Sequence, residues 1–257
     1  DCTPGRFLLP GDLAGSPVLT FAPLPGTEGT RGSLWREMSR RFEAYKSKVI
    51  RPFFETHFTR LDRQVVLIDV LEAVHRGPAA LEDQRRAMAE VLAAFRPGAN
   101  GFFSSLLRGK RVEKILFAAT KADHLHHTQH AKLTALAEAM LRDARDRAHF
   151  SGAETKALSI AALRATVEET RMHKGSEVDL VRGQLADGRQ AAVNAGDLPE
   201  DPSRLLAPAR EGAERWLQGD YGVMHFAPPV LNRTPGQGLP HIRLDAAAEF
   251  LIGDRLV

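Results

Sequence analysis

The sequence contains a single cysteine, Cys2, and no apolar run that approaches the ~20 residues of a membrane-spanning helix. One thiol can neither close an internal disulfide nor supply a four-thiolate metal site, so a disulfide scaffold is excluded. The 257 residues are 43% hydrophobic and 26% charged, which is enough to bury a large core and excludes a disordered or collagen-like chain. The net charge of +3 is mild, so we expect no nucleic-acid partner.

The chain also lacks an initiator methionine and a leader in which basic residues precede an apolar stretch. From this beginning we expect a fragment of a longer protein. Proline and glycine are dense in the first thirty or so residues, which predicts an irregular surface segment.

From Leu34 onward, apolar residues recur at steps of three and four, which predicts an amphipathic helix that Pro52 breaks or kinks. Residues 31–63 contain nine Lys/Arg and four Asp/Glu. Such a basic helix is suited to an anionic membrane surface or an acidic protein partner, and a solvated face is the simpler interpretation. A non-enzymatic interaction module is therefore one alternative for this protein.

The middle of the chain alternates apolar runs of strand length with helical patterns. We expect strands at 64–71, 112–119 and 156–160, and helices at 81–95 and 126–150. Strands that alternate with helices at this spacing predict a doubly wound α/β sheet. Ligands of such sheets bind beyond the carboxyl ends of the strands.

After about Arg171 the pattern changes to that of a small β-hairpin and a helical appendage. Two strands at 178–185 and 189–193 flank Asp187-Gly188, a strong hairpin-turn signal. A proline-rich stretch at 196–208 is followed by an expected short helix at 210–217. A last helix is expected after Asp245, its predicted N-cap, to end near Gly253.

Thr120-Lys121-Ala122-Asp123 follows the second expected strand. A carboxylate held at a strand exit can accept both the ring N–H and the exocyclic amine of guanine, and the preceding lysine stem can cover the face of the base. This is the logic of the N/T-K-x-D element of GTP-binding proteins. The alternative is a polar turn in which Asp123 caps the following helix.

The turn after the third expected strand strengthens the first interpretation. Ser159-Ile160-Ala161-Ala162-Leu163 consists mainly of small residues, and the backbone N–H groups of Ala161 and Ala162 are candidate donors to the guanine carbonyl. It stands one helix after the lysine–aspartate element, which is the order found in GTPases.

On these motifs the chain resembles the carboxyl-terminal part of the YcjX-like family of bacterial P-loop, GTPase-like proteins, also described as predicted ATPases. The resemblance implies a P-loop fold, guanine-nucleotide (GTP or GDP) binding with Mg²⁺, a cytoplasmic location with peripheral membrane association, and a role in stress response. It covers essentially the whole chain, and the segments that carry it are Gly5–Leu13, Leu61–Asp69, Phe117–His127, Gly196–Pro202 and Gly238–Leu244.

Two phosphate-handling elements of that family are absent from these residues. The sequence contains no G-x-x-x-x-G-K-S/T loop and no D-x-x-G that follows a strand, so we expect both to lie upstream. Phosphoryl transfer depends on that loop, its lysine and Mg²⁺, so we expect no GTP turnover by this chain alone and assign no catalytic residue. Thr120 stands where asparagine is commoner, which leaves the choice between GTP and ATP open.

Two further groups of polar residues have competing interpretations. Asp69 ends an apolar strand and is either a magnesium-coordinating acid or, as we prefer, a residue that caps or borders the site. The histidine group His124, His126, His127 and His130 makes a metal-binding protein a second alternative. Within it, His126 and His130 stand four residues apart, a spacing that grips zinc on a helix, with Asp123 as a further oxygen ligand. Because a third ligand has to be assumed, we predict no metal ligand here and expect exposed histidines at the start of a helix.

The sequence thus predicts an incomplete P-loop GTPase-like α/β fold in three parts. Residues 1–63 form an irregular segment plus the amphipathic helix, residues 64–172 the base-binding half of the GTPase-like domain, and residues 173–257 the hairpin and the C-terminal helical part. The predicted nucleotide-binding residues are Thr120, Lys121, Asp123, Ala161 and Ala162.

Overall fold

The computed structural model describes residues 15–22, 24–26, 29–56, 61–93, 112–150, 152–216, 219–231 and 238–256. The chain divides into two compact units, one of residues 1–61 with 105–110 and one of residues 62–104 with 111–257. The predicted three-part division at residues 63 and 172 stays a prediction. The resemblance segment Gly5–Leu13 and the last two residues of the helix expected at 81–95 lie outside the described residues.

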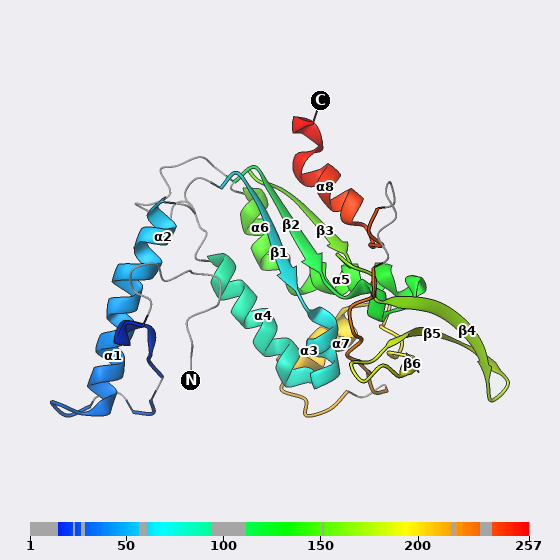
Figure 1. Ribbon diagram of the computed structural model, residues 1–257, viewed down its shortest axis with the longest axis horizontal. Coiled ribbons are helices and arrows are strands. Elements are labelled where there is room, and N and C mark those ends of the chain that lie inside the picture. Colours follow the sequence, from blue (N-terminus) through cyan, green and yellow to red (C-terminus); the bar gives the residue numbers. More distant parts are fainter. Residues whose placement is uncertain are drawn as a thin grey trace. The chain divides into compact units, whose positions relative to one another are not determined.

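The smaller unit contains one helical stretch from Leu34 to Thr56, drawn in blue in Figure 1. It comprises α1 (Leu34–Tyr45), a π-helical turn (Lys46–Ile50) and α2 (Arg51–Thr56), preceded by the short 3₁₀ turn Pro17–Leu19. Ser33 caps α1, because its hydroxyl accepts a hydrogen bond from the Arg36 N–H at 3.4 Å. The ring of Phe21 packs on Phe42 and Tyr45 at centroid distances of 5.2 and 5.3 Å.

Of the two outcomes predicted at Pro52, a break or a kink, the break is wrong, because the helix continues through this residue. A proline ring collides with the carbonyl four residues earlier in a regular α-helix. Here the turn before Pro52 is widened, since the Arg51 N–H bonds the carbonyl of Lys46, five residues back. The irregularity is therefore a π-helical turn, and the backbone resumes α-helical geometry through Pro52.

The larger unit is built on a three-stranded parallel sheet in the order β1-β2-β3 (Figure 1). Its strands are β1 (Arg63–Ile68), β2 (Lys114–Ala119) and β3 (Glu154–Ser159). Helices α3 (Val70–Arg76) and α4 (Pro78–Ala93) follow β1, and α5 (His130–Met140) and α6 (Arg142–Phe150) follow β2. The predicted parallel α/β arrangement is confirmed.

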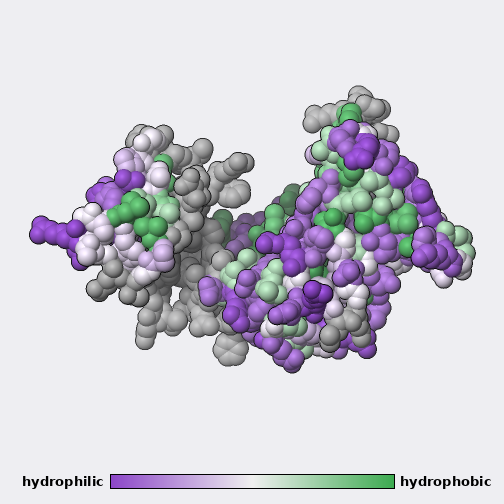
Figure 2. Space-filling view, turned by 90° about the horizontal axis from the view of Figure 1, so that it is seen from below, coloured by the Kyte–Doolittle hydropathy of each residue, from purple (hydrophilic) through white to green (hydrophobic). Residues whose placement is uncertain are grey.

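The two faces of this sheet are covered unequally. One face and the helices α3, α4 and α5 enclose the main core, with Phe117 at 1% exposure among its largest side chains. On the other face, α8 (Leu244–Ile252) packs Ala247 and Phe250 against Leu116 of β2. This helix reaches β1 only near Arg63, whose guanidinium donates to the Leu251 carbonyl, and Val65 and Leu67 farther along the strand stay 43% and 63% exposed. Polar residues cover most of the surface in Figure 2, with smaller hydrophobic areas between them.

An antiparallel sheet with the order β4-β5-β6 extends from the larger unit. It consists of β4 (Thr166–His173), β5 (Ser176–Gln184) and β6 (Gln190–Val193). The predicted hairpin around Asp187-Gly188 is confirmed as the β5–β6 pair. Strand β4 was not predicted; it pairs with β5 across Lys174-Gly175, both in the left-handed region with φ values of 50° and 84°.

Several predicted element boundaries were wrong. The first predicted strand ends at Ile68 and not at residue 71, because the Asp69 carboxylate accepts a hydrogen bond from the Glu72 N–H and starts α3. The predicted helix 126–150 is two helices that meet at Leu141, and the first begins only at His130.

The C-terminal helices are shifted as well. The helix expected at 210–217 lies at Ser203–Arg210 (α7), where Pro202 precedes its first turn and Asp201 accepts from the Ser203 N–H at 2.9 Å. Asp245 is not an N-cap, because α8 already begins at Leu244 and Asp245 lies in its first turn. Within the described residues, every helix is too short or too polar to span a membrane.

Candidate functional site

The carboxyl ends of the three parallel strands lie side by side. The register pairs Ile68 with Ala119 and Ala119 with Ser159, so the turns that follow begin at one edge of the sheet. The Thr120 N–H donates to the Ile68 carbonyl at 2.9 Å, and the Ala122 N–H donates to the Ile160 carbonyl at 3.0 Å. The structure thus brings together the two turns that the sequence singled out.

Lys121 is held between two carboxylates at this edge. Its backbone is left-handed, with a φ of 61°, which is unfavourable for a residue other than glycine and is concentrated at functional sites in proteins. The ammonium Nζ lies 2.7 Å from Oδ2 of Asp69 and 3.9 Å from Oε2 of Glu72. Asp69 therefore caps α3 and borders the site, in agreement with our preferred interpretation of this residue.

Asp123 is 5% exposed and ties its turn to the start of β4. Its Oδ2 accepts a hydrogen bond from the Ala165 N–H at 2.9 Å, and its backbone carbonyl accepts one from the Thr166 hydroxyl. Asp123 lies in the 3₁₀ turn Ala122–His124 and not at the start of α5, so the alternative that it caps the following helix is wrong. Within the described residues its Oδ1 accepts no hydrogen bond.

The two predicted backbone donors differ in their surroundings. Ala161 is buried and forms a β-bridge with Ile242, and its N–H donates to the Ile242 carbonyl at 3.1 Å. Ala162 is exposed, and within the described part of the chain its N–H has no partner. The N–H of Ala162 is therefore the one available to a ligand in this conformation.

His130 supports this edge of the sheet from below the surface. It is 3% exposed, and its Nε2 lies 2.7 Å from the Ala122 carbonyl and 3.2 Å from that of Leu125. Burial lowers the pKa of the imidazole below its ordinary range, so the ring is a neutral donor to these carbonyls. His130 is a structural residue that holds the turn containing Asp123.

This position excludes the zinc pair that the sequence suggested. A 3₁₀ turn, His127–Gln129, precedes α5, so His126 and His130 do not share a helix face. The expectation of exposed histidines is also wrong for His124, which is 8% exposed and packs edge-on against Phe226 at 5.4 Å. Burial lowers the pKa of His124 as well, and its Nδ1 has no hydrogen-bond partner.

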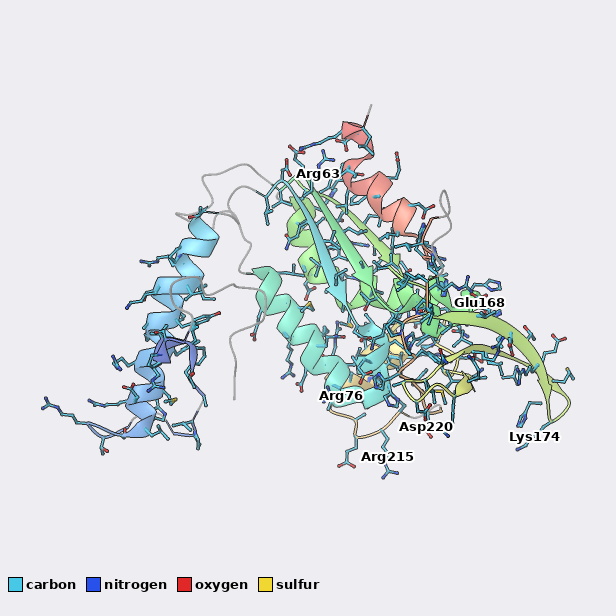
Figure 3. The ribbon with its side chains drawn as sticks, viewed as in Figure 1. Arg63, Arg76, Glu168, Lys174, Arg215 and Asp220 are labelled. Atoms are coloured by element: carbon cyan, nitrogen blue, oxygen red, sulfur yellow. The ribbon has the colours of Figure 1, made fainter. Side chains whose placement is uncertain are left out.

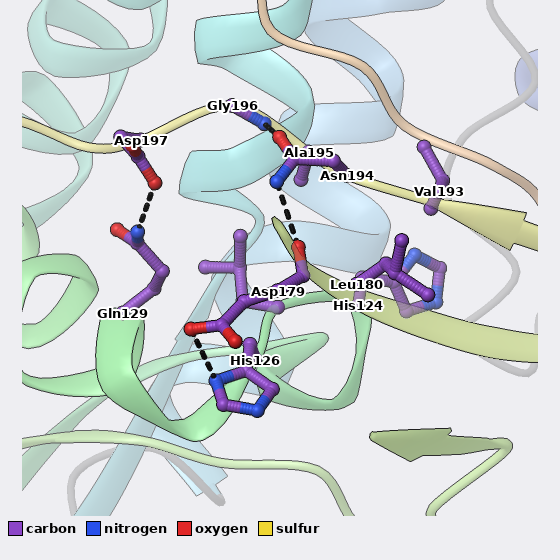
Figure 4. Close-up of a pocket in the computed structure, with 11 residues that line it drawn as sticks. His124, His126, Gln129, Asp179, Leu180, Val193, Asn194, Ala195, Gly196 and Asp197 are labelled. Atoms are coloured by element: carbon purple, nitrogen blue, oxygen red, sulfur yellow. Dashed lines mark hydrogen bonds and ion pairs between the residues drawn. The ribbon is translucent and has the colours of Figure 1, made fainter. Parts of the chain in front are cut away.

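A narrow pocket lies between the turn after β2 and the strands β5 and β6 (Figure 4). Sequence reasoning missed it, because its walls come from segments about fifty residues apart. The Gln129 amide donates to Oδ1 of Asp197 at 2.6 Å and accepts from the Leu198 N–H at 3.1 Å. Asp123 is not among the lining residues, which are His124, Leu125, His126, Gln129, Asp179, Leu180, Val193, Asn194, Ala195, Gly196 and Asp197.

The parallel sheet, its crossover helices and the turns at its carboxyl ends define a P-loop-like α/β protein. The chain belongs to the YcjX-like family, DUF463, whose family model matches residues 1–256. It is 37% identical over 266 residues to the Ras-like GTPase YcjX of Escherichia coli (strain K12), covering 98% of this chain and 54% of that protein. It is 30% identical over 264 residues to the Ras-like GTPase YcjX of Shewanella oneidensis (strain MR-1), covering 98% and 53%. The chain thus spans about half the length of these curated relatives.

Proposed function

We propose that this chain supplies the base-binding half of a guanine-nucleotide site in a GTP-binding P-loop protein. The observation that carries the proposal is the hydrogen-bonded junction of the turn at residues 120–123 with the turn at residues 160–162, at the carboxyl ends of neighbouring strands. Two relatives that bear the name Ras-like GTPase support it. The phosphate-binding half, and the Mg²⁺ that accompanies the phosphates, belong in this proposal to residues outside the matched half of those relatives.

The geometry of Asp123 suits a carboxylate that reads a base. One oxygen is fixed by the Ala165 N–H at 2.9 Å, which orients the carboxyl group, and the other has no competing hydrogen bond. Guanine offers a ring N–H and an exocyclic amine on one edge, and both donate to a carboxylate. The Ala162 N–H is the donor that we assign to the guanine carbonyl. Lys121, fixed beside Asp69, places its apolar stem at the same edge, where it would cover the base.

The exposed edge of β1 supports a larger sheet. On the face that α8 covers over β2, the neighbouring side chains Val65 and Leu67 of β1 remain exposed. Strands of parallel sheets are normally covered on both faces, because crossover helices pack on them. Further strands and a helix beside β1 would cover this surface and complete the phosphate-binding side.

We also propose that the chain alone does not turn over GTP, that the complete protein is cytoplasmic and peripheral to the membrane, and that it acts in stress response.

The interaction alternative receives less support from α1. Its excess of basic residues is reduced by local pairing, since Arg40 and Arg41 both bind Glu37 at 2.9 and 2.8 Å. Lys46 likewise pairs with Glu43 at 2.6 Å. A membrane- or partner-binding face needs unpaired cations, so we rank this function below nucleotide binding.

The test uses a polypeptide in which this chain is joined to the remaining half of the family sequence. Asp123→Asn keeps an oxygen that can accept from the Ala165 N–H. It replaces the other oxygen, which would accept from guanine, with an NH₂ group, which can donate to the carbonyl of xanthine. Loss of a charged hydrogen bond costs about 1.5–3 kcal/mol, so we expect GDP to bind roughly 10- to 100-fold more weakly and XDP more tightly, measured by calorimetry.

Asp187→Asn is the matched control, because Asp187 is an exposed carboxylate in the β5–β6 turn that also accepts from a backbone N–H. An unchanged guanine preference in Asp123→Asn removes Asp123 from the base pocket. GTP hydrolysis by this chain at the rate of the joined polypeptide contradicts the division into two halves.

A further inference from the structure

A cluster of histidine and carboxylate side chains lies at the base of the β4–β5 hairpin, away from the strand ends. One ligand atom from each of His126, His127 and Glu168 lies within 4.8 Å of the other two. Nδ1 of His127 is 2.6 Å from Oε2 of Glu168, and Nε2 of His126 is 3.7 Å from the same oxygen. Figure 3 shows Glu168 near the base of the hairpin and Lys174 at its tip. The three atoms therefore converge on one point from two separate segments.

The second nitrogen of His126 is already oriented. Its Nδ1 lies 3.2 Å from Oδ2 of Asp179 and 3.0 Å from the hydroxyl of Thr128, and Figure 4 shows the contact with Asp179. Asp179 in turn accepts from the Thr170 hydroxyl at 2.9 Å. Histidines that bind metals usually donate their other ring N–H to a carboxylate, which fixes the tautomer and directs the free lone pair at the metal. This arrangement leaves the Nε2 lone pair of His126 directed toward Glu168.

The charges and the exposure of the cluster suit a cation. Arg164 Nη2 binds Oε1 of Glu168 at 3.0 Å and leaves Oε2 for another partner. The carboxylates of Glu168 and Asp179 both contact the His126 imidazole. The side chain of His126 is 10% exposed and that of His127 is 66% exposed, which leaves an entry path from solvent.

We propose that His126 Nε2, His127 Nδ1 and Glu168 Oε2 bind a divalent transition-metal ion, with zinc as the ion that this ligand set fits best. Two imidazoles and one carboxylate form a three-ligand set that leaves a fourth tetrahedral position for water or a ligand. Two ligand atoms about 2.0–2.1 Å from a tetrahedral zinc ion lie roughly 3.3 Å from each other. His126 Nε2 and Glu168 Oε2, at 3.7 Å, are already close to this separation. His127 Nδ1 and Glu168 Oε2, at 2.6 Å, are too close, so the exposed ring of His127 must move away from Glu168.

The bound ion has a structural consequence for the whole larger unit. His126 and His127 directly follow the turn that contains Asp123, whereas Glu168 belongs to β4. A metal held by both segments fixes the hairpin to that turn. The site is independent of the proposed base-binding role, because none of its three ligands is a predicted nucleotide-binding residue.

The experiment titrates the purified chain with Zn²⁺ against a chromophoric chelator and records the visible absorption of Co²⁺ as a tetrahedral reporter. We expect one ion per chain and an affinity at least about 100-fold lower in the double variant His126→Ala/His127→Ala. Asp179→Asn should lose roughly 10- to 100-fold, because Asp179 contacts His126 among the three proposed ligands and is not itself a ligand. His173→Ala removes an exposed histidine from the far end of β4 and should leave the affinity unchanged.

Equal affinities in the wild type and the double variant overturn the proposal, as does the absence of saturable binding at one ion per chain. If circular dichroism shows that the double variant is unfolded, the site is tested by nuclear magnetic resonance of the wild type alone. Co²⁺ should then shift or broaden the imidazole resonances of His126 and His127 first, and an effect confined to other histidines refutes the site.

Discussion

Truncation of Asp123 separates its structural role from base recognition. The carboxylate is 5% exposed and accepts the Ala165 N–H at 2.9 Å, which joins the turn after β2 to the start of β4. Asp123→Ala removes this acceptor and leaves a half-buried N–H without a partner, whereas Asp123→Asn retains an oxygen of the same reach. The two variants therefore differ in stability by the energy of that hydrogen bond.

The expected magnitude follows from the burial of the pair. An unsatisfied buried donor costs about 1–3 kcal/mol, and hydrogen bonds to charged acceptors lie in the upper part of that range. For a domain of this size, each kcal/mol lowers the melting temperature by roughly 2–4 °C, so Asp123→Ala should melt about 2–12 °C below the wild type. Asp123→Asn should unfold within about 1 kcal/mol of the wild type.

The assay is urea unfolding followed by circular dichroism, together with thermal melts at a fixed protein concentration. If Asp123→Ala is as stable as the wild type, the carboxylate does not hold Ala165 and the geometry on which the base-binding proposal depends is wrong. The same conclusion follows if Asp123→Asn is destabilised as strongly as Asp123→Ala.

Two other predictions concern the core and the response to acid. Phe117→Ala removes a side chain that is 1% exposed and should lower the free energy of chemical unfolding by about 3–5 kcal/mol. Val167→Ala, at an exposed position of β4, should change it by less than about 0.5 kcal/mol. Equal effects of the two substitutions would contradict the assigned core. The pKa of Glu82 is lowered from 4.5 to about 2, mainly by the hydrogen bond from Arg85 and further by Arg86. Because the folded pKa is the lower one, this stabilisation is complete above pH 4.5 and disappears as the pH falls toward 2. Glu82→Gln should therefore lose about 1–2 kcal/mol at pH 7 and less than about half of that at pH 3, and a pH-independent difference contradicts the pairing.

The predictions from sequence succeeded where one physical signal was dominant. The runs 64–68 and 114–119 are mostly apolar over the length of a strand, and β2 shows the burial on both faces of a parallel sheet that such a run predicts. Asp187-Gly188 marked its hairpin because glycine adopts a positive φ at no steric cost. Strand β4 was missed because its sequence, Thr166–His173, is mostly polar and pairs with β5 mainly through its backbone.

The predicted ends of helices and strands were wrong where a side-chain hydrogen bond decides between two local structures. Val70 and Leu71 continue an apolar run, but the Asp69 cap directs them into α3. Residues 127–129 fit a helical pattern, yet His130 holds the preceding turn by hydrogen bonds to two of its carbonyls, and this places the first turn of α5 later than expected. Neither hydrogen bond is visible in hydrophobic periodicity.

In the candidate sites, too, features that follow from the local sequence were predictable, and contacts between distant segments were not. The pairing of residues 120–123 with residues 160–162 was predictable, since the carboxyl ends of neighbouring parallel strands always share one edge of a sheet. The Ala161–Ile242 bridge was not, because its partners lie about eighty residues apart. Sequence reasoning paired His126 with His130 by their spacing and predicted no metal ligand, and Glu168, the third ligand in our proposal, approaches His126 and His127 only through the fold.

By itself, the order of apolar runs, glycines and prolines determined that this protein forms a parallel α/β sheet with a lysine–aspartate turn at its edge, because these preferences act within a few residues of the chain. The tertiary structure alone decided which polar atoms meet. Whether Asp123 faces a backbone N–H, or His126 a carboxylate, depends on the packing of strands that are distant in sequence, and no local preference encodes that contact.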